Sequence, residues 1–153
     1  MQSLPKRSEP IFRVRAWIGY LSGRWHLARQ IHAHLTGQQG TLTGTASFTG
    51  NNPVNRHWHE HGTLSIGTYE GEAWREYRVV QADDGMTRIT FDDGRPFFDL
   101  PNSLGRADID HSCPPDRYIG TIDILSENQW RLDWTIRGPR KNLTIGTVYT
   151  REP

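Results

Sequence analysis

An arginine in a segment that alternates like a β-strand is the first candidate for chemistry in this chain. Strand alternation places Arg29 in one row with Trp25, Leu27 and Ile31, the row that should face an apolar interior. A buried charge is costly unless a partner compensates for it. We therefore expect either an internal carboxylate or an anionic ligand beside Arg29.

Glu60 occupies the same kind of position in a later segment. It shares its parity with Trp58, Gly62 and Leu64, so its carboxylate should also point inward. Two interpretations remain open. A Glu60–Arg29 ion pair would be structural and would fix the register of the strands. Alternatively, Arg29 binds a ligand carboxylate or phosphate in a bidentate manner, and Glu60 orients that ligand or acts as an acid or base.

A second group of reactive side chains lies close together in the sequence: His111, Cys113, Asp116 and Tyr118. Histidine titrates near neutral pH and a thiolate is a nucleophile, so the group could serve acid–base or covalent catalysis. The alternative is that Asp116 and Tyr118 hydrogen-bond the loop backbone while Cys113 fills space. If the protein is an enzyme, we expect His111, Asp116 and Tyr118 to be its catalytic residues.

Three alternating histidines, His57, His59 and His61, project from one strand face in the manner of a metal-chelating comb. Their parity is opposite to that of Glu60, so they should lie on the outside as a solvated face. The group around His111 offers one cysteine and one histidine, with no second pair at zinc-ligand spacing. We expect no metal site.

The bulk composition excludes several classes of function. The chain has 153 residues, and 18 lysines and arginines against 17 acids give a net charge of +1, so nucleic acid and anionic membrane are not expected as partners. No apolar run approaches the length of a membrane span, and the first residues lack the apolar core of a signal peptide. We expect one cytoplasmic domain over 1–153, with 1–9 flexible.

The segments that must position these side chains are mostly strands. Ser8 can cap a helix whose apolar residues run at helical spacing to Leu21, and Gly23 lies where that helix should end. Short turns of hairpin type separate the alternating runs that follow. The expected strands are 24–33, 41–48, 57–69, 73–82, 86–92, 95–100, 116–125, 129–137 and 142–151.

Short connections force antiparallel neighbours, and an eight- or nine-stranded meander after one helix closes most naturally into an up-and-down barrel. The composition agrees, because 35% hydrophobic residues with six tryptophans suit a structure in which alternate residues face inward. Eight to ten strands leave room for one small ligand. A sandwich of two sheets is the alternative. The stretch 101–115 is expected to be a long loop.

Gly23-Arg24-Trp25 directly after the short helix resembles the Gly-x-Trp signature of lipocalins and their calycin relatives. In those families an arginine near the end of the last strand packs over the tryptophan, and Arg151 stands in the matching place. The resemblance implies a closed barrel. Some lipocalin-like barrels bind haem through a late histidine, but the last histidine here is His111, so we expect no cofactor.

A closer resemblance covers nearly the whole chain and is to a family of small lipocalin-like proteins known only as a domain of unknown function. The matching segments are 91–97, 111–118, 138–141 and the Tyr-x-Arg end at 149–151. The family often has histidine where this chain has Phe98. The resemblance implies the barrel but no particular activity.

The leading hypothesis is a barrel that binds a small apolar ligand with an anionic or polar end inside. Arg29 and Glu60 would serve the polar end, with Arg95 as a further binding residue, and the walls would be Trp25, Trp74, Trp134 and Tyr149. The alternative is a metal-independent isomerase, cyclase or hydratase, with Glu60 joining the group at 111–118. A third is a protein-interaction module that uses 101–115. The sequence does not predict the oligomeric state.

Overall fold

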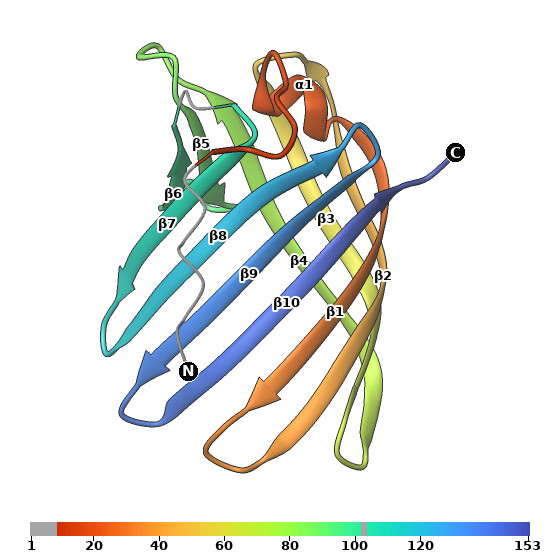
Figure 1. The fold of residues 1–153 in the computed structure, drawn as a ribbon, viewed down its shortest axis with the longest axis vertical. Helices are drawn as coiled ribbons and strands as arrows, with labels where there is room; N and C mark the ends of the chain where they lie inside the picture. Colours follow the sequence, from red (N-terminus) through yellow and green to blue (C-terminus); the bar gives the residue numbers. More distant parts are fainter. Residues whose placement is uncertain (1–8, 102–103) are drawn as a thin grey trace.

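The computed structural model describes residues 9–101 and 104–153. Within them, one short helix precedes ten antiparallel strands that curl into a nearly closed barrel (Figure 1). The elements are α1 (Trp17–Leu21), β1 (Gly23–Ala33), β2 (Gln38–Asn52), β3 (Asn55–Ile66), β4 (Tyr69–Gln81), β5 (Thr87–Phe91), β6 (Pro96–Leu100), β7 (Arg106–Cys113), β8 (Asp116–Ser126), β9 (Gln129–Gly138) and β10 (Lys141–Arg151).

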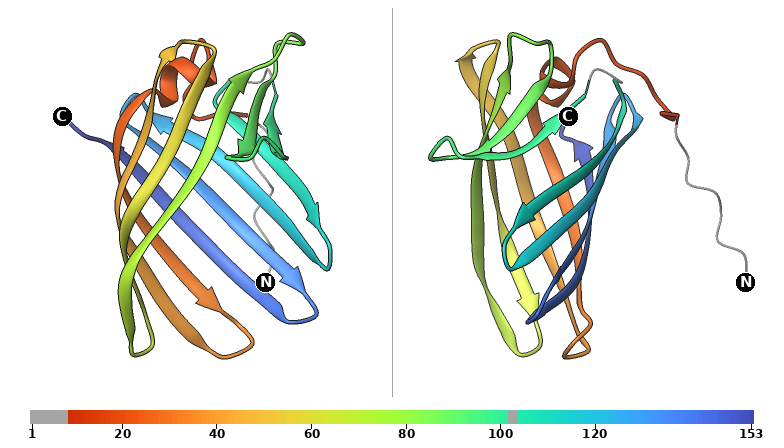
Figure 2. Two further views of the ribbon diagram at one scale, coloured as in Figure 1. Left: turned by 180° about the vertical axis from the view of Figure 1, so that it is seen from behind. Right: turned by 90° about the vertical axis from the view of Figure 1, so that its left-hand side faces the viewer.

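The strands form one sheet in the order β6-β5-β4-β3-β2-β1-β10-β9-β8-β7. Strands that are consecutive in sequence pair with each other, apart from β6 and β7, which are the two edges of the sheet. One further pairing joins the first strand, β1, to the last, β10. These edges lie near each other but share no ladder among the described residues (Figure 2). The up-and-down barrel expected from the sequence is confirmed, with an open seam between β6 and β7.

The strand count was wrong, because ten strands replace the expected eight or nine. The missing strand is β7, which lies in the stretch expected to be a loop. Its inward residues, Ala107 and Ile109, alternate with the acids Asp108 and Asp110. Two apolar residues in eight positions are a weak alternation signal, and pairing with β8 supplies the order that the sequence pattern does not show.

The helix is shorter than expected. It comprises only Trp17–Leu21, after Ala16 in extended conformation, and the expected cap Ser8 lies outside the described residues. Trp17 and Leu21 are buried, and the Trp17 indole donates to the carbonyl oxygen of Pro101 at 3.0 Å. Contact with the barrel end therefore stabilises the helix at Trp17–Leu21.

The half of the barrel beneath α1 is filled by aromatic side chains. Trp25, Trp130 and Tyr149 are fully buried, and Trp130 stacks on Tyr149 with ring centroids 3.8 Å apart. Toward the other end, inward residues such as Ile31 and Leu64 are only half-buried. Figure 1 shows α1 covering one end while only hairpins surround the other. The barrel thus has a filled half and a more open half.

No helix within the described residues is both long and apolar enough to span a membrane.

Candidate functional site

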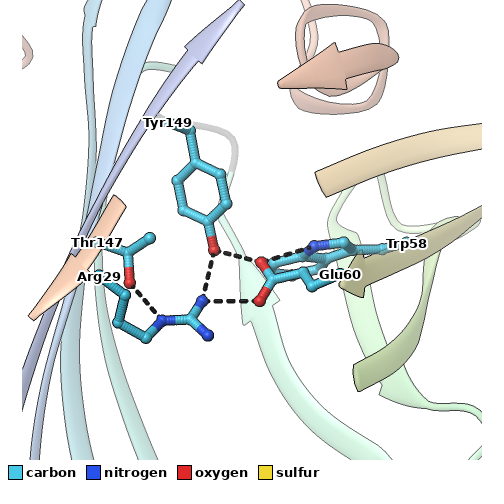
Figure 3. A network of polar contacts seen from close by, with 5 residues as sticks. All are labelled: Arg29, Trp58, Glu60, Thr147 and Tyr149. Atoms are coloured by element: carbon cyan, nitrogen blue, oxygen red, sulfur yellow. Dashed lines mark hydrogen bonds and ion pairs between the residues drawn. The ribbon is translucent and has the colours of Figure 1, made fainter. Parts of the chain in front are cut away.

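The two inward charges contact each other directly. Arg29 lies in the middle of β1 and Glu60 in β3, with β2 between them in the sheet. Inside the barrel, Arg29 Nη2 donates to Glu60 Oε1 at 2.7 Å, and their side chains are only 6% and 4% exposed (Figure 3). The contact is therefore the buried Glu60–Arg29 ion pair of the first interpretation.

Three more side chains complete a buried network (Figure 3). Arg29 Nε donates to Thr147 Oγ1 at 2.8 Å, and its Nη2 also donates to the Tyr149 hydroxyl at 3.2 Å. That hydroxyl donates to Glu60 Oε2 at 2.5 Å, and Trp58 Nε1 donates to the same oxygen at 3.2 Å. Both oxygens of the buried carboxylate are satisfied, which compensates for much of its desolvation.

Burial and neighbouring charges fix the protonation states in this network. Burial raises the pKa of Tyr149 well above its ordinary value, and the Glu60 carboxylate raises it further. Burial disfavours the charged form of Arg29, but Tyr149 and Glu60 together raise the pKa of Arg29 above its ordinary value. At neutral pH, Tyr149 is therefore a neutral donor and Arg29 is a cation.

One terminal nitrogen of Arg29 takes no part in the network. Its Nε and Nη2 make all the hydrogen bonds that join it to described side chains. Nη1 points away from Glu60 and Tyr149 (Figure 3). Because a guanidinium carries five N–H donors in a fixed fork, Nη1 can still donate to a group that enters from the open half.

Two small cavities have Arg29, Glu60 and Arg75 in common. The first has a volume of about 20 Å³ and lies against the aromatic rings of Phe97 and Trp134. The second has a volume of about 80 Å³. Its apolar wall comes from the open half of β1 to β4 and consists of Ile31, Leu42, Leu64 and Ala73.

Arg75 on β4 is a second cation at both cavities, and it was not among the binding residues predicted from the sequence. It stands opposite Glu60 in the β3–β4 register and hydrogen-bonds the side chain of Tyr77, whose pKa is raised by burial. No ion pair joins Arg75 to a carboxylate of residues 9–101 or 104–153. Two guanidiniums and one carboxylate of the described residues line these cavities, so the lining is net positive.

Comparison with protein families finds one match, over residues 21–151, to a family of unknown function, DUF6314. The chain belongs to DUF6314. This confirms the resemblance to an uncharacterised family of barrel proteins. Comparison with curated proteins finds no match.

Comparison with solved structures finds chains that resemble this DUF6314 fold. The S-type phycobiliprotein lyase CPES from Guillardia theta matches with a TM-score of 0.65 and 9% identity, over 93% of this chain and 94% of that chain. A redesigned barrel, mFAP0, bound to DFHBI, matches with a TM-score of 0.47 and 15% identity, over 86% of this chain and 99% of that chain. At 9% identity, the match to the lyase shows the shared fold alone.

Two of the expected wall residues do line the interior of the DUF6314 barrel. Trp134 borders the first cavity and stacks on Phe97, with centroids 5.5 Å apart and planes 10° apart. Tyr149 borders the same cavity and takes part in the Arg29 network. Phe98 also borders this cavity.

Trp25 does not line either cavity. It is fully buried beneath α1, its indole donates to the carbonyl oxygen of Leu21 at 2.8 Å, and the Arg151 guanidinium lies 4.1 Å from its ring centroid. The stacking of Arg151 on Trp25, which the calycin resemblance implied, is confirmed. The role of Trp25 as a wall of a ligand cavity is corrected, because the stack belongs to the filled end.

Two further expected binding residues lie on the outside. Trp74 is 64% exposed because strand alternation gives the inward row of β4 to Arg75 and Tyr77, although Trp74 still borders the second cavity. Arg95 lies in the turn between β5 and β6, where it pairs with Asp93 at 2.7 Å and borders neither cavity. In both cases residue type was a poorer guide than position.

The three expected catalytic residues do not meet at one cavity. His111 and Tyr118 face each other on paired strands near the seam, and both rings pack against Phe97. Asp116 is directed to Lys141, at 3.3 Å. None of the three borders either cavity, so the convergence that acid–base catalysis by this group would require is not present.

Proposed function

We propose that the open half of the barrel binds a small organic anion. The acid group would lie between Arg29 Nη1 and Arg75, and the apolar part would lie against Trp134 or the aliphatic wall that includes Leu42. The observation that carries this proposal is the excess of positive charge at the two cavities, together with one unused terminal nitrogen of a buried guanidinium. Nη1 of Arg29 can donate one charge-assisted hydrogen bond to the acid group, and the Arg75 guanidinium can supply another.

The size of the cavities limits the ligand. Ligand pockets for drug-sized molecules are about 300–1,000 Å³, and a cavity of roughly 150 Å³ can hold benzene. The second cavity, at about 80 Å³, has room for a carboxyl group and a short stretch of carbon. A larger ligand would extend toward the open end, and the exposed Arg75 side chain would have to move aside.

The test is a panel of aromatic and short-chain fatty acids, each measured beside its primary amide. Binding would be followed by native mass spectrometry and by the ligand-dependent shift in melting temperature. We expect acids to bind and to raise the melting temperature. The matching amides should bind about tenfold more weakly or worse, because a charge-assisted hydrogen bond contributes about 1.5–3 kcal/mol.

A matched pair of variants tests whether the anion binds at the cavities. Arg75→Gln removes a cation from the cavities, and Arg78→Gln removes one from the outer face of the same strand. We expect Arg75→Gln to weaken acid binding about tenfold or more and Arg78→Gln to leave it unchanged. The proposal fails if no acid in the panel binds, if acids and amides bind alike, or if the two variants behave alike.

A further inference from the structure

A separate cluster of side chains with metal-ligand chemistry lies on the outer face of the barrel. His57 comes from β3, Glu76 from β4 and Asp92 from the turn that follows β5. One possible ligand atom from each residue lies within 4.8 Å of the other two. All three side chains are accessible, at 36%, 42% and 52% exposure, so a cation can reach them from solvent.

We propose that His57, Glu76 and Asp92 bind a divalent transition-metal ion of the zinc type. One imidazole nitrogen and two carboxylate oxygens are a donor set that such ions accept, with water in the remaining positions. Ligands at about 2.1 Å from one ion stand at most about 4.2 Å apart. The three ligand atoms lie within 4.8 Å of one another, so small rotations of the exposed side chains would bring them close enough to bind one ion.

Two neighbours tune this site in opposite directions. His59 Nδ1 lies 3.3 Å from Glu76 Oε1, where it can orient the carboxylate as an outer-shell partner. Arg78 Nε lies 4.0 Å from Asp92 Oδ1, so its cation competes with a metal ion for that carboxylate. Metal binding should therefore become tighter when Arg78 is neutralised.

The three alternating histidines could be recognised in the sequence, but the set of His57, Glu76 and Asp92 could not. His61 belongs to the same outward row, yet it faces Glu72 at 3.9 Å and is not part of the cluster. The two carboxylates of the site come from a different strand and from a turn, which parity along β3 cannot place. His61 is consequently a control matched in residue type, strand and face.

A metal ion at this position would connect three segments of the sheet. Asp92 directly follows Phe91, the last residue of β5, and β5 pairs with β4 beside the open seam. Binding to the folded chain alone would raise the melting temperature in proportion to the logarithm of metal concentration above the dissociation constant. This gives a second readout that is independent of any small-molecule ligand.

The test uses the full chain without a histidine tag, stripped with EDTA and dialysed, and titrated with Zn²⁺ alone by calorimetry and thermal melting. We expect saturable binding at one site per chain. His57→Ala and Asp92→Asn should each weaken it by tenfold or more, since even an outer-shell partner is worth about 10–100-fold. His61→Ala should leave it unchanged, and Arg78→Gln should strengthen it.

Three results would overturn the proposal. The first is a wild-type protein with no saturable Zn²⁺ binding. The second is an equal loss in His57→Ala and His61→Ala, which would mean adventitious chelation by the histidine row. The third is unchanged binding in Asp92→Asn. Circular dichroism of each variant shows whether it is folded, and the expected gain in Arg78→Gln cannot be produced by misfolding.

Discussion

Removing the Arg29 side chain while leaving Glu60 in place should destabilise the barrel strongly. In Arg29→Met, a carboxylate with 4% side-chain exposure loses its cation. Breaking a buried ion pair on one side typically costs about 3–5 kcal/mol. Glu60 retains two donors, Tyr149 and Trp58, so we expect the lower end of this range, about 3 kcal/mol. For a domain of this size, that corresponds to a fall in melting temperature of roughly 6–12 °C.

A second substitution should restore most of that stability. Arg29→Met with Glu60→Gln removes the uncompensated charge but keeps an acceptor oxygen for the tyrosine and indole donors. Replacing a whole buried pair is often neutral, so we expect the double variant within about 1 kcal/mol of wild type. The coupling energy between the two sites would then be about 2 kcal/mol plus whatever Glu60→Gln costs by itself.

The assay is urea unfolding at pH 7 for wild type, the two single variants and the double variant. Arg131→Met is the control, because Arg131 pairs with Asp133 on the exposed face and should matter by less than about 1 kcal/mol. A double variant as unstable as Arg29→Met would refute the reasoning, since the cost could not then come from an unpaired Glu60. The recovered double variant should still fail to bind organic acids.

Three other perturbations test the filled end, the ionisation of a tyrosine and the aromatic wall. Arg151→Met should cost about 1–3 kcal/mol in urea unfolding, because Arg151 stacks on Trp25 and donates to carbonyl oxygens beneath α1. Burial raises the pKa of Tyr20 to about 12, so its contribution to stability is complete below pH 10 and is lost as pH rises toward 12; Tyr20→Phe should flatten that part of the stability profile. Gly120→Ala would place a Cβ atom 2.6 Å from the Trp134 ring, so tryptophan fluorescence should change together with acid binding, and unchanged emission would contradict the proposed wall.

Strand parity predicted correctly which face Arg29 and Glu60 occupy, but it could not predict that they touch. Parity assigns a side chain to the inside or the outside of a sheet. The distance between β1 and β3 across the interior depends on how strongly β2 curls between them. That curvature comes from the whole ten-stranded sheet, and no local pattern in the sequence encodes it.

The omission of Arg75 beside Trp74 has the opposite origin. The two residues are adjacent, so one must face inward and the other outward. Tryptophan is the more hydrophobic residue, and its type favoured the inward assignment. The alternation of Ala73, Tyr77 and Val79 favoured the opposite assignment. Arg75 belongs to their inward row, whereas Trp74 does not. A charged residue in an otherwise apolar row was the useful signal on β1 and β3, and it was available on β4 as well.

The ion pair with Glu60 and the proposed binding of an anion are compatible, because they use different nitrogens of one guanidinium. Nε and Nη2 of Arg29 are held by Thr147, Glu60 and Tyr149, which leaves Nη1 with a fixed direction. A side chain that is already immobilised loses little further conformational entropy when a ligand arrives. Glu60 cancels one positive charge but not the second, on Arg75, so the cavities keep their preference for an anion. The buried carboxylate therefore acts as a positioning group for Arg29.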